Sequence, residues 1–269
     1  MKAKKVLFIS QEMLPYMDAT QMAYINRQLP QAIQTEGCEI RIFMPRWGVI
    51  NERRNQLHEV IRLSGMNIII NDTDHPLIIK VASVPQSRMQ VYFIDNDDFF
   101  KGREVLSDAK GKEYPDNFER AVFFARGVIE TVRKLYWVPD IIVCQGWAAS
   151  LAPLLMKTAY REEPPFISSK VVFQLDAVCP KDPPQANLEA CIMQRGVDMG
   201  EIKSLGIDLM QPGSPMRLAV KYSDAVVQAV GGAMPDLVKE AEAEGKPVLR
   251  IKDIKKLRET YTTFFDSLL

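Results

Sequence analysis

The sequence predicts an α/β fold in which a doubly wound, mostly parallel β-sheet carries helices on both faces and includes a β-hairpin insertion. Two observations support this class. Apolar runs of strand length alternate with segments of helical periodicity along most of the 269 residues. Residues 58–94 interrupt the alternation, because they contain only short β-rich runs separated by turn residues.

The first three elements illustrate the pattern. A buried parallel strand is expected at residues 5–10, where four apolar residues follow one another. A helix is expected over residues 21–35, and Gly37 suits its C-terminal end. A second strand at residues 38–44 stops at Pro45. This strand–helix–strand order predicts a Rossmann-like sheet.

The remaining elements continue the alternation. Further helices are expected at residues 117–135, 147–160, 184–210 (broken near Gly196 and Gly200), 216–222, 234–244 and 252–269. Further strands are expected at residues 139–144, 170–175, 224–228 and 247–251. The insertion has β-rich runs at residues 60–63, 67–70, 77–81 and 90–94, which predict hairpins or a meander. No linker divides the chain, so residues 1–269 are predicted to form a single domain.

The C-terminal segment, residues 252–269, is strongly amphipathic. One face of the expected helix carries Ile254, Leu257, Tyr261, Phe264, Phe265 and Leu268. Such a face must be covered, so the helix is expected to dock on its own domain or on a partner.

Composition limits the function. Lys plus Arg equals Asp plus Glu, at 34 each, which argues against nucleic acid or an anionic membrane as a partner. No apolar run reaches the roughly 18 residues of a membrane helix, and the N-terminus lacks a secretory apolar region, so we expect a cytoplasmic protein. The four cysteines form no Cys-x-x-Cys pair and there are two histidines, so no metal and no cofactor are expected.

The turn after the first strand is unusual. In doubly wound folds this turn commonly holds anionic ligands on glycine backbone and on a helix N-terminus. Here it contains Asp18, Thr20 and Gln21, and it has neither glycine nor lysine. The turn is therefore poorly suited to a phosphate group.

Several segments together resemble the first domain of bacterial glycogen synthases and plant starch synthases. They are residues 6–16, 29–32, 37–41, 44–50, 91–96, 114–120, 137–142 and 222–226, in the family's order and with compatible spacing. The resemblance implies the N-terminal half of a two-domain retaining glycosyltransferase, which moves glucose from ADP-glucose or UDP-glucose to an α-1,4-glucan. It covers only that first domain, whereas the family's second domain holds most of the nucleotide site.

The departures from the family fall at its ligand-handling loops. The family's Lys-Thr-Gly-Gly loop aligns with residues 18–21, its His-Asp-Trp-His segment with residues 145–148, and its later His-Asn with residues 176–177. The altered positions are therefore Asp18, Thr20, Gln21, Gln145, Gly146, Ala148, Asp176 and Ala177. The lysine, both loop glycines and all three histidines are absent.

Five residues remain where the family has matching residues near its cleft. Glu12, Tyr16, Asp116, Asn117 and Trp147 could supply the carboxylate, amide and aromatic contacts of a sugar site. They could equally be scaffold, since Asp116 and Asn117 can cap a helix and Trp147 can fill core.

The resemblance and its departures predict a non-catalytic relative that binds a partner protein, a second copy of itself, or a glucan or sugar ligand. Two enzymatic alternatives stay open. The chain could be a glycosyltransferase half completed by a second chain, or another small-molecule enzyme that uses the same crevice.

Overall fold

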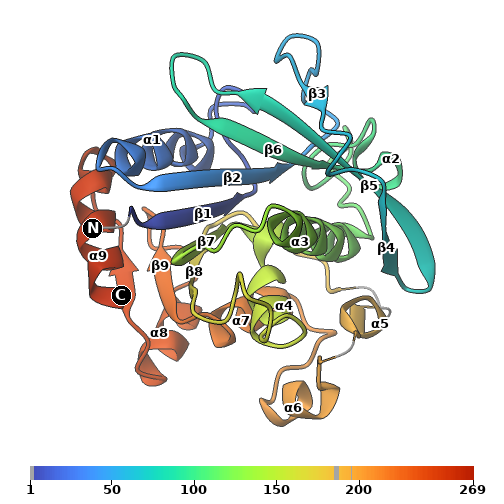
Figure 1. Cartoon of the computed structure of the whole chain (residues 1–269). Coiled ribbons are helices and arrows are strands. Elements are labelled where there is room, and N and C mark those ends of the chain that lie inside the picture. Colours follow the sequence, from blue (N-terminus) through green and yellow to red (C-terminus); the bar gives the residue numbers. More distant parts are fainter. Residues whose placement is uncertain (1–2, 185–187, 195) are drawn as a thin grey trace.

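The computed structural model describes residues 3–184, 188–194 and 196–269. It confirms the α/β fold with a mostly parallel central sheet (Figure 1). The strand order is β10-β9-β8-β7-β1-β2-β6-β5-β3, and β4 pairs with β5 outside this path. All pairings from β10 to β6 are parallel, and β3, β4 and β5 are joined by antiparallel pairings.

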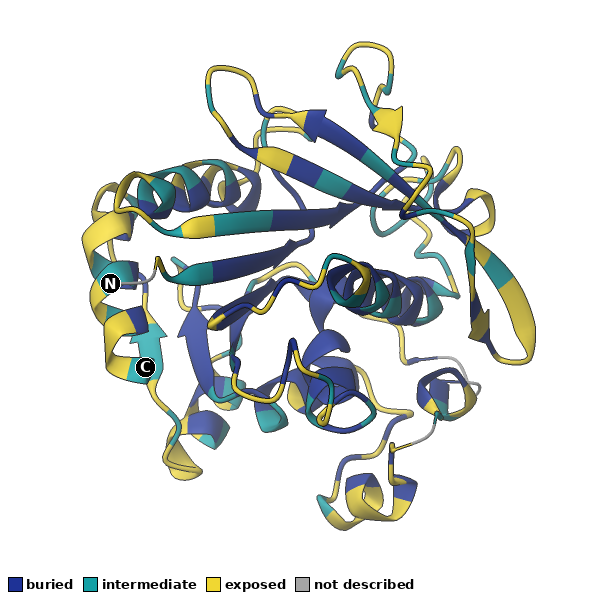
Figure 2. Cartoon of the chain, in the orientation of Figure 1, coloured by how far each residue is buried: buried dark blue, intermediate teal, exposed yellow. Residues whose placement is uncertain are grey.

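The strands of the sheet have these bounds: β1 Lys5–Ser10, β2 Glu39–Pro45, β3 His58–Glu59, β4 Met66–Ile70, β5 Thr73–Ser83, β6 Gln90–Asp95, β7 Ile141–Gln145, β8 Lys170–Leu175, β9 Ala225–Gln228 and β10 Val248–Arg250. The central strands β7, β8 and β9 are almost wholly buried, as their continuous apolar sequences predict (Figure 2).

The helices are α1 Gln21–Thr35, α2 Asp97–Phe100, α3 Asn117–Lys134, η1 Trp147–Ala149, α4 Ala152–Lys157, α5 Leu188–Ile192, α6 Met199–Ser204, α7 Ser214–Lys221, α8 Pro235–Ala243, η2 Ile254–Lys256 and α9 Leu257–Leu268. Helix α3 contacts α4, α4 contacts α7 and α7 contacts α8, so these four form one continuous layer. Helices α1 and α9 pack together on the other face of the sheet, as the direction of the crossovers requires.

The β-rich segment differs from the prediction in two places. Strand β6 pairs in parallel with β2 and so belongs to the main sheet rather than to an insertion over residues 58–94. Residues 60–63, expected as a strand, form a turn, and the strand beside β5 is the short β3. An apolar run predicts a strand but not its partner, which explains why β6 could not be placed from the sequence.

The region expected as one broken helix over residues 184–210 is a long excursion with two short helices, α5 and α6. The part of that expectation at residues 185–187 and 195 lies outside the described residues. The final helix starts as a 3₁₀ turn and becomes α-helical at Leu257, a few residues later than expected.

The C-terminal helix α9 docks on its own chain. Leu257, Tyr261 and Phe265 are buried, and the Tyr261 hydroxyl donates a 2.7 Å hydrogen bond to Gln174 Oε1 on β8. An ion pair between Lys4 and Asp266 ties the helix to the start of β1. The apolar face noted in the sequence is therefore covered within the chain.

All four cysteines are free thiols, with Cys144 and Cys191 buried. In the described part of the chain, no helix has the length and apolarity needed to cross a bilayer.

Candidate functional site

The carboxyl ends of parallel strands are the edge where α/β folds place their ligands, and here they carry a row of buried polar side chains. Ser10 on β1, Gln145 on β7 and Gln174 on β8 are neighbours in register, so they share one face of the sheet. Ser10 Oγ donates to Gln145 Oε1 at 2.6 Å, and Gln145 Nε2 donates to Gln174 Oε1 at 3.2 Å. Tyr261 completes the row from α9. We call this network the glutamine row; Gln174 Nε2 in it is buried and has no hydrogen-bond partner among the described residues.

Glu12, just beyond β1, is also committed internally. Its Oε1 accepts a 2.8 Å hydrogen bond from Gln11 Nε2, and its Oε2 accepts a 2.6 Å bond from Thr20 Oγ1. Thr20 in turn accepts from the backbone N–H of Ala23 at 2.9 Å, which caps helix α1. Each carboxylate oxygen therefore already has an internal donor, and Glu12 is only 7% exposed.

Gln11 also fills the space beside the turn after β7. Gly146 has a φ of +81°, and a Cβ built on it would lie 2.5 Å from Gln11 Oε1. The same Oε1 accepts from the Ala148 backbone N–H at 3.3 Å. The glycine is therefore required by close approach and by backbone conformation. Its neighbour Gln145 cannot replace a histidine as a proton donor or acceptor, because an amide does not titrate.

The two aromatic candidates are core residues. Trp147 is completely buried, with ring centroids 5.9 Å from Trp47 and 6.4 Å from Phe118. Tyr16 is 5% exposed and packs edge-on against Phe93, and burial raises the pKa of Tyr16 to about 12. Neither ring is exposed, and Tyr16 Oη and Trp147 Nε1 are buried without a partner among the described residues, so their role in a sugar site stays a prediction.

Asp116 and Asn117 stabilise the loop before α3. Asp116 makes no side-chain cap, contrary to the capping prediction, and instead pairs with Arg103, whose Nη1 lies 2.7 Å from Asp116 Oδ2. Asn117 Nδ2 donates to the Leu106 carbonyl at 2.9 Å, and Asn117 Oδ1 accepts from Arg120 at 2.9 Å. These contacts are structural.

Sequence reasoning missed Arg120, which organises this loop. Its guanidinium is buried and donates to the backbone carbonyls of Phe99, Glu104 and Val105. Desolvation lowers the pKa of Arg120 to about 9. An arginine within an apolar helical stripe was the available signal, because such a residue must find several acceptors.

The remaining altered positions follow strands β1 and β8. Asp18, Gln21 and Ala177 are exposed, and Asp176 is half-buried. In the described residues, no group of three or more His, Cys, Asp or Glu side chains is arranged to hold a metal ion. Among the described residues, five cavities with volumes of about 210 to 800 Å³ all lie away from Glu12, Tyr16, Asp116, Asn117 and Trp147, none of which lines them.

The mostly parallel sheet has the fold of a glycosyltransferase catalytic domain. The catalytic domain of Starch Synthase IV from Arabidopsis thaliana, solved bound to ADP and acarbose, superposes with a TM-score of 0.76 at 17% identity. That match covers 94% of this chain and 52% of the other chain, and it concerns the fold alone.

The sequence comparisons identify the family. A family model described as the starch synthase catalytic domain matches residues 5–233, and the chain belongs to this family. It is 40% identical over 172 residues to a glycogen synthase of Chlorobium luteolum and 41% identical over 169 residues to one of Chlorobaculum tepidum. These matches cover 64% and 62% of this chain and 35% of each relative, so the chain spans about a third of their length.

Proposed function

We propose that this domain is a non-catalytic member of the starch synthase catalytic domain family that acts by binding rather than by glucosyl transfer. The observation that carries the proposal is the filled strand-end crevice. Most polar groups there already have partners in the chain: the glutamine row is bonded internally except at Gln174 Nε2, and Glu12 accepts from Gln11 and Thr20. A ligand there would have to break bonds already satisfied within the protein.

Charge supports the same conclusion. The position that aligns with the family's loop lysine is Asp18, which repels a diphosphate instead of attracting it. Two unit charges about 4 Å apart interact by roughly 4 kcal/mol at an effective dielectric constant near 20. Asp18 is exposed, so solvent and salt screen most of this energy and the sign reversal weakens nucleotide-sugar binding by about tenfold or less.

The proton chemistry is also altered. The three positions that align with family histidines hold Gln145, Ala148 and Asp176. Gln145 and Ala148 have no group that titrates near neutral pH, and Gln145 is bonded at both ends of its amide. None of the three side chains carries an imidazole, and only Asp176 has a group that titrates.

Calorimetry with ADP-glucose and UDP-glucose, followed by a transfer assay with maltoheptaose as acceptor, tests the proposal. We expect neither saturable nucleotide-sugar binding up to about 1 mM nor elongation of the acceptor. An active glycogen synthase from Chlorobaculum tepidum is the positive control. Elongation by the purified chain would overturn the proposal.

The binding role takes one of two forms, a protein partner (including a second copy of this chain) or a glucan. Size-exclusion chromatography with light scattering measures self-association directly. Maltooligosaccharide titration measures the second form.

A further inference from the structure

The loop that follows β8, residues 176–184, is hydrogen-bonded to the rest of the chain through one side chain. We call this segment the β8 exit loop. The backbone N–H of Lys181 donates to both carboxylate oxygens of Glu113, at 3.1 and 3.0 Å, and the N–H of Asp182 donates to Glu113 Oε2 at 3.2 Å. Among the described residues, the exit loop makes no other hydrogen bond to a residue outside itself.

This contact joins two loops that leave the same edge of the sheet from distant strands. Glu113 lies in the segment between β6 and α3, and β6 is separated from β8 by β2, β1 and β7. All these strands are parallel, so both loops start at the carboxyl ends, where α/β folds place their ligands. The exit loop also begins at Asp176, one of the altered positions. The contact therefore lies at the border of the strand-end crevice.

The segment that carries Glu113 is firmly held. The buried Arg120 donates to the backbone carbonyls of Glu104 and Val105 at 2.8 and 2.9 Å. Ser107 and Glu113 form an antiparallel bridge that closes the loop on itself. Several independent bonds would have to break before Glu113 could move, so its carboxylate is presented from a fixed support.

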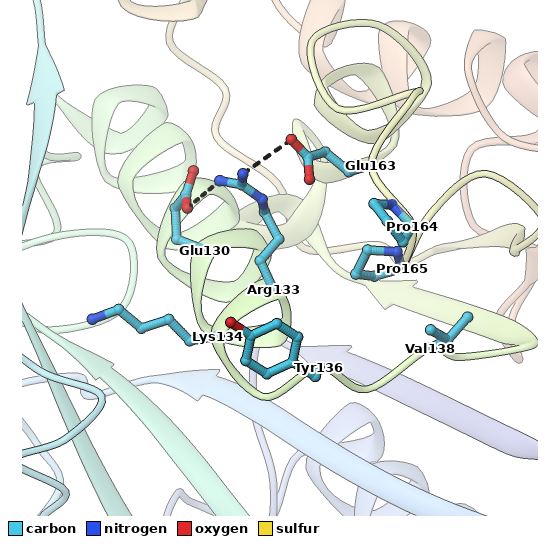
Figure 3. A pocket seen from close by; sticks show the side chains of 8 residues that line it. All are labelled: Glu130, Arg133, Lys134, Tyr136, Val138, Glu163, Pro164 and Pro165. Carbon is cyan, nitrogen blue, oxygen red and sulfur yellow. Dashed lines mark hydrogen bonds and ion pairs between the residues drawn. The ribbon is translucent and has the colours of Figure 1, made fainter.

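The loop that enters β8 at the opposite edge is also fixed by several contacts. Arg133 Nη2 lies 3.0 Å from Glu163 Oε1, and Figure 3 shows this pair beside the end of α3. Ser169 Oγ lies 2.6 Å from the Pro139 carbonyl and 2.7 Å from that of Pro165. The two ends of β8 are thus anchored unequally, and the exit loop is the weakly anchored one.

The remaining anchorage of the exit loop is apolar. Pro180 and Pro184 are buried, whereas Lys181, Asp182 and Pro183 are exposed. The three prolines have no N–H and restrict the backbone, so the loop has few donors with which to form other bonds. Apolar burial is not directional, and the bonds to Glu113 therefore fix the position of the loop.

Cys179 lies within the exit loop and reports on its position. The thiol is half-buried, and burial followed by the negative charge of Glu113 raises the pKa of Cys179. Because the thiolate is the reactive form, the closed loop suppresses the reactivity of this cysteine. Movement of the loop away from Glu113 would remove both effects.

We propose that Glu113 is a latch that holds the β8 exit loop closed at the border of the strand-end crevice. Loss of its carboxylate releases the loop while the rest of the domain stays folded, as expected of a locally opening segment. The latch does not rest on the proposed function, because its opening is measured without any ligand.

Amide hydrogen exchange followed by mass spectrometry tests the latch in the full chain. We expect Glu113→Ala to speed exchange of the Lys181 and Asp182 amides at least tenfold. Glu113→Gln should have a smaller effect, because its amide keeps one acceptor oxygen but loses the charge. Alkylation of Cys179 by iodoacetamide should accelerate in the same order.

Two controls separate latch release from general destabilisation. Glu104→Ala removes an exposed carboxylate from the same segment, and Arg120 bonds only the backbone carbonyl of Glu104, so exchange in the exit loop should not change. Cys38 is a second half-buried thiol and should be alkylated at the same rate in every variant.

Three results would overturn the inference. They are unchanged exchange at Lys181 and Asp182 in Glu113→Ala, an equal acceleration in Glu104→Ala, and faster alkylation of Cys38 in step with Cys179. The transfer assay reports on glucosyl transfer independently, so loss of either proposal leaves the other measurable.

Discussion

The Thr20 hydroxyl donates a 2.6 Å hydrogen bond to Glu12 Oε2 and joins the end of the first strand to the start of the first helix. The same oxygen accepts from the Ala23 N–H. One small side chain therefore caps α1 and occupies a carboxylate at the strand-end crevice. In related folds this turn holds anions. Here its Thr20 side chain links the end of β1 to the start of α1.

Thr20→Val should lower the free energy of unfolding by about 1–3 kcal/mol, because it removes the cap and leaves a nearly buried carboxylate short of a donor. Urea unfolding followed by circular dichroism measures the change. Thr35→Val, at the exposed C-terminal end of the same helix, should change it by less than about 0.5 kcal/mol. Equal effects of the two substitutions would show that the Thr20–Glu12 bond is not stabilising.

Tyr261 provides a second stability test, because its hydroxyl is the link between α9 and the glutamine row. Tyr261→Phe should cost about 1 kcal/mol by losing the bond to Gln174, whereas Tyr261→Ala should cost about 3–5 kcal/mol by leaving a cavity. Tyr222→Phe is the control, since its bond to Glu201 is long, at 3.2 Å, and exposed. The denaturation midpoints of the three variants measure these costs. A Tyr261→Ala variant with the midpoint of the unaltered chain would contradict the docking of α9 described above.

Restoring family-like residues at the crevice should not restore transfer. Asp18→Lys removes a repulsive charge and should strengthen ADP-glucose binding only modestly, by about tenfold or less, because Asp18 is exposed and screened. Adding Gln145→His to this variant breaks the glutamine row. The other altered positions still lack the family's residues. The coupled assay of ADP release should stay at background for the double variant. Turnover above that background would show that the lost residues, rather than the filled crevice, limit the reaction.

Stability should fall in alkaline solution because of buried tyrosines. Burial raises the pKa of Tyr16 and of Tyr160 to about 12 from the ordinary 10, and burial also raises the pKa of Tyr261. The folded state therefore holds protons that the unfolded state releases, so this stability is fully present below pH 10 and is lost as the pH rises toward 12. Unfolding midpoints between pH 7 and 11, with absorbance at 295 nm, measure it. Tyr16→Phe should flatten the decline, and an unchanged slope would argue against the Tyr16 contribution.

Local sequence patterns determined most strands and helices of the sheet and the family motifs, but not the turn at residues 60–63 or the short helices α5 and α6. The apolar runs at β1, β7 and β8 have the composition of buried parallel strands, and their order along the chain leaves few topologies. The altered positions, such as Asp18 and Ala148, were also visible, because motif comparison needs no coordinates. Apolar runs and short motifs depend only on residues that are near one another in the chain, so the sequence alone shows them.

Only the tertiary structure decided which side chains meet. Ser10, Gln145, Gln174 and Tyr261 are distant in sequence and form one row because parallel pairing and the return of α9 bring them together. Burial of Trp147 and the pairing of β6 with β2 likewise depend on long-range contacts. A polar or aromatic residue has the same local signature whether it contacts a ligand or the protein itself, so its role is decided by the partners that folding places around it.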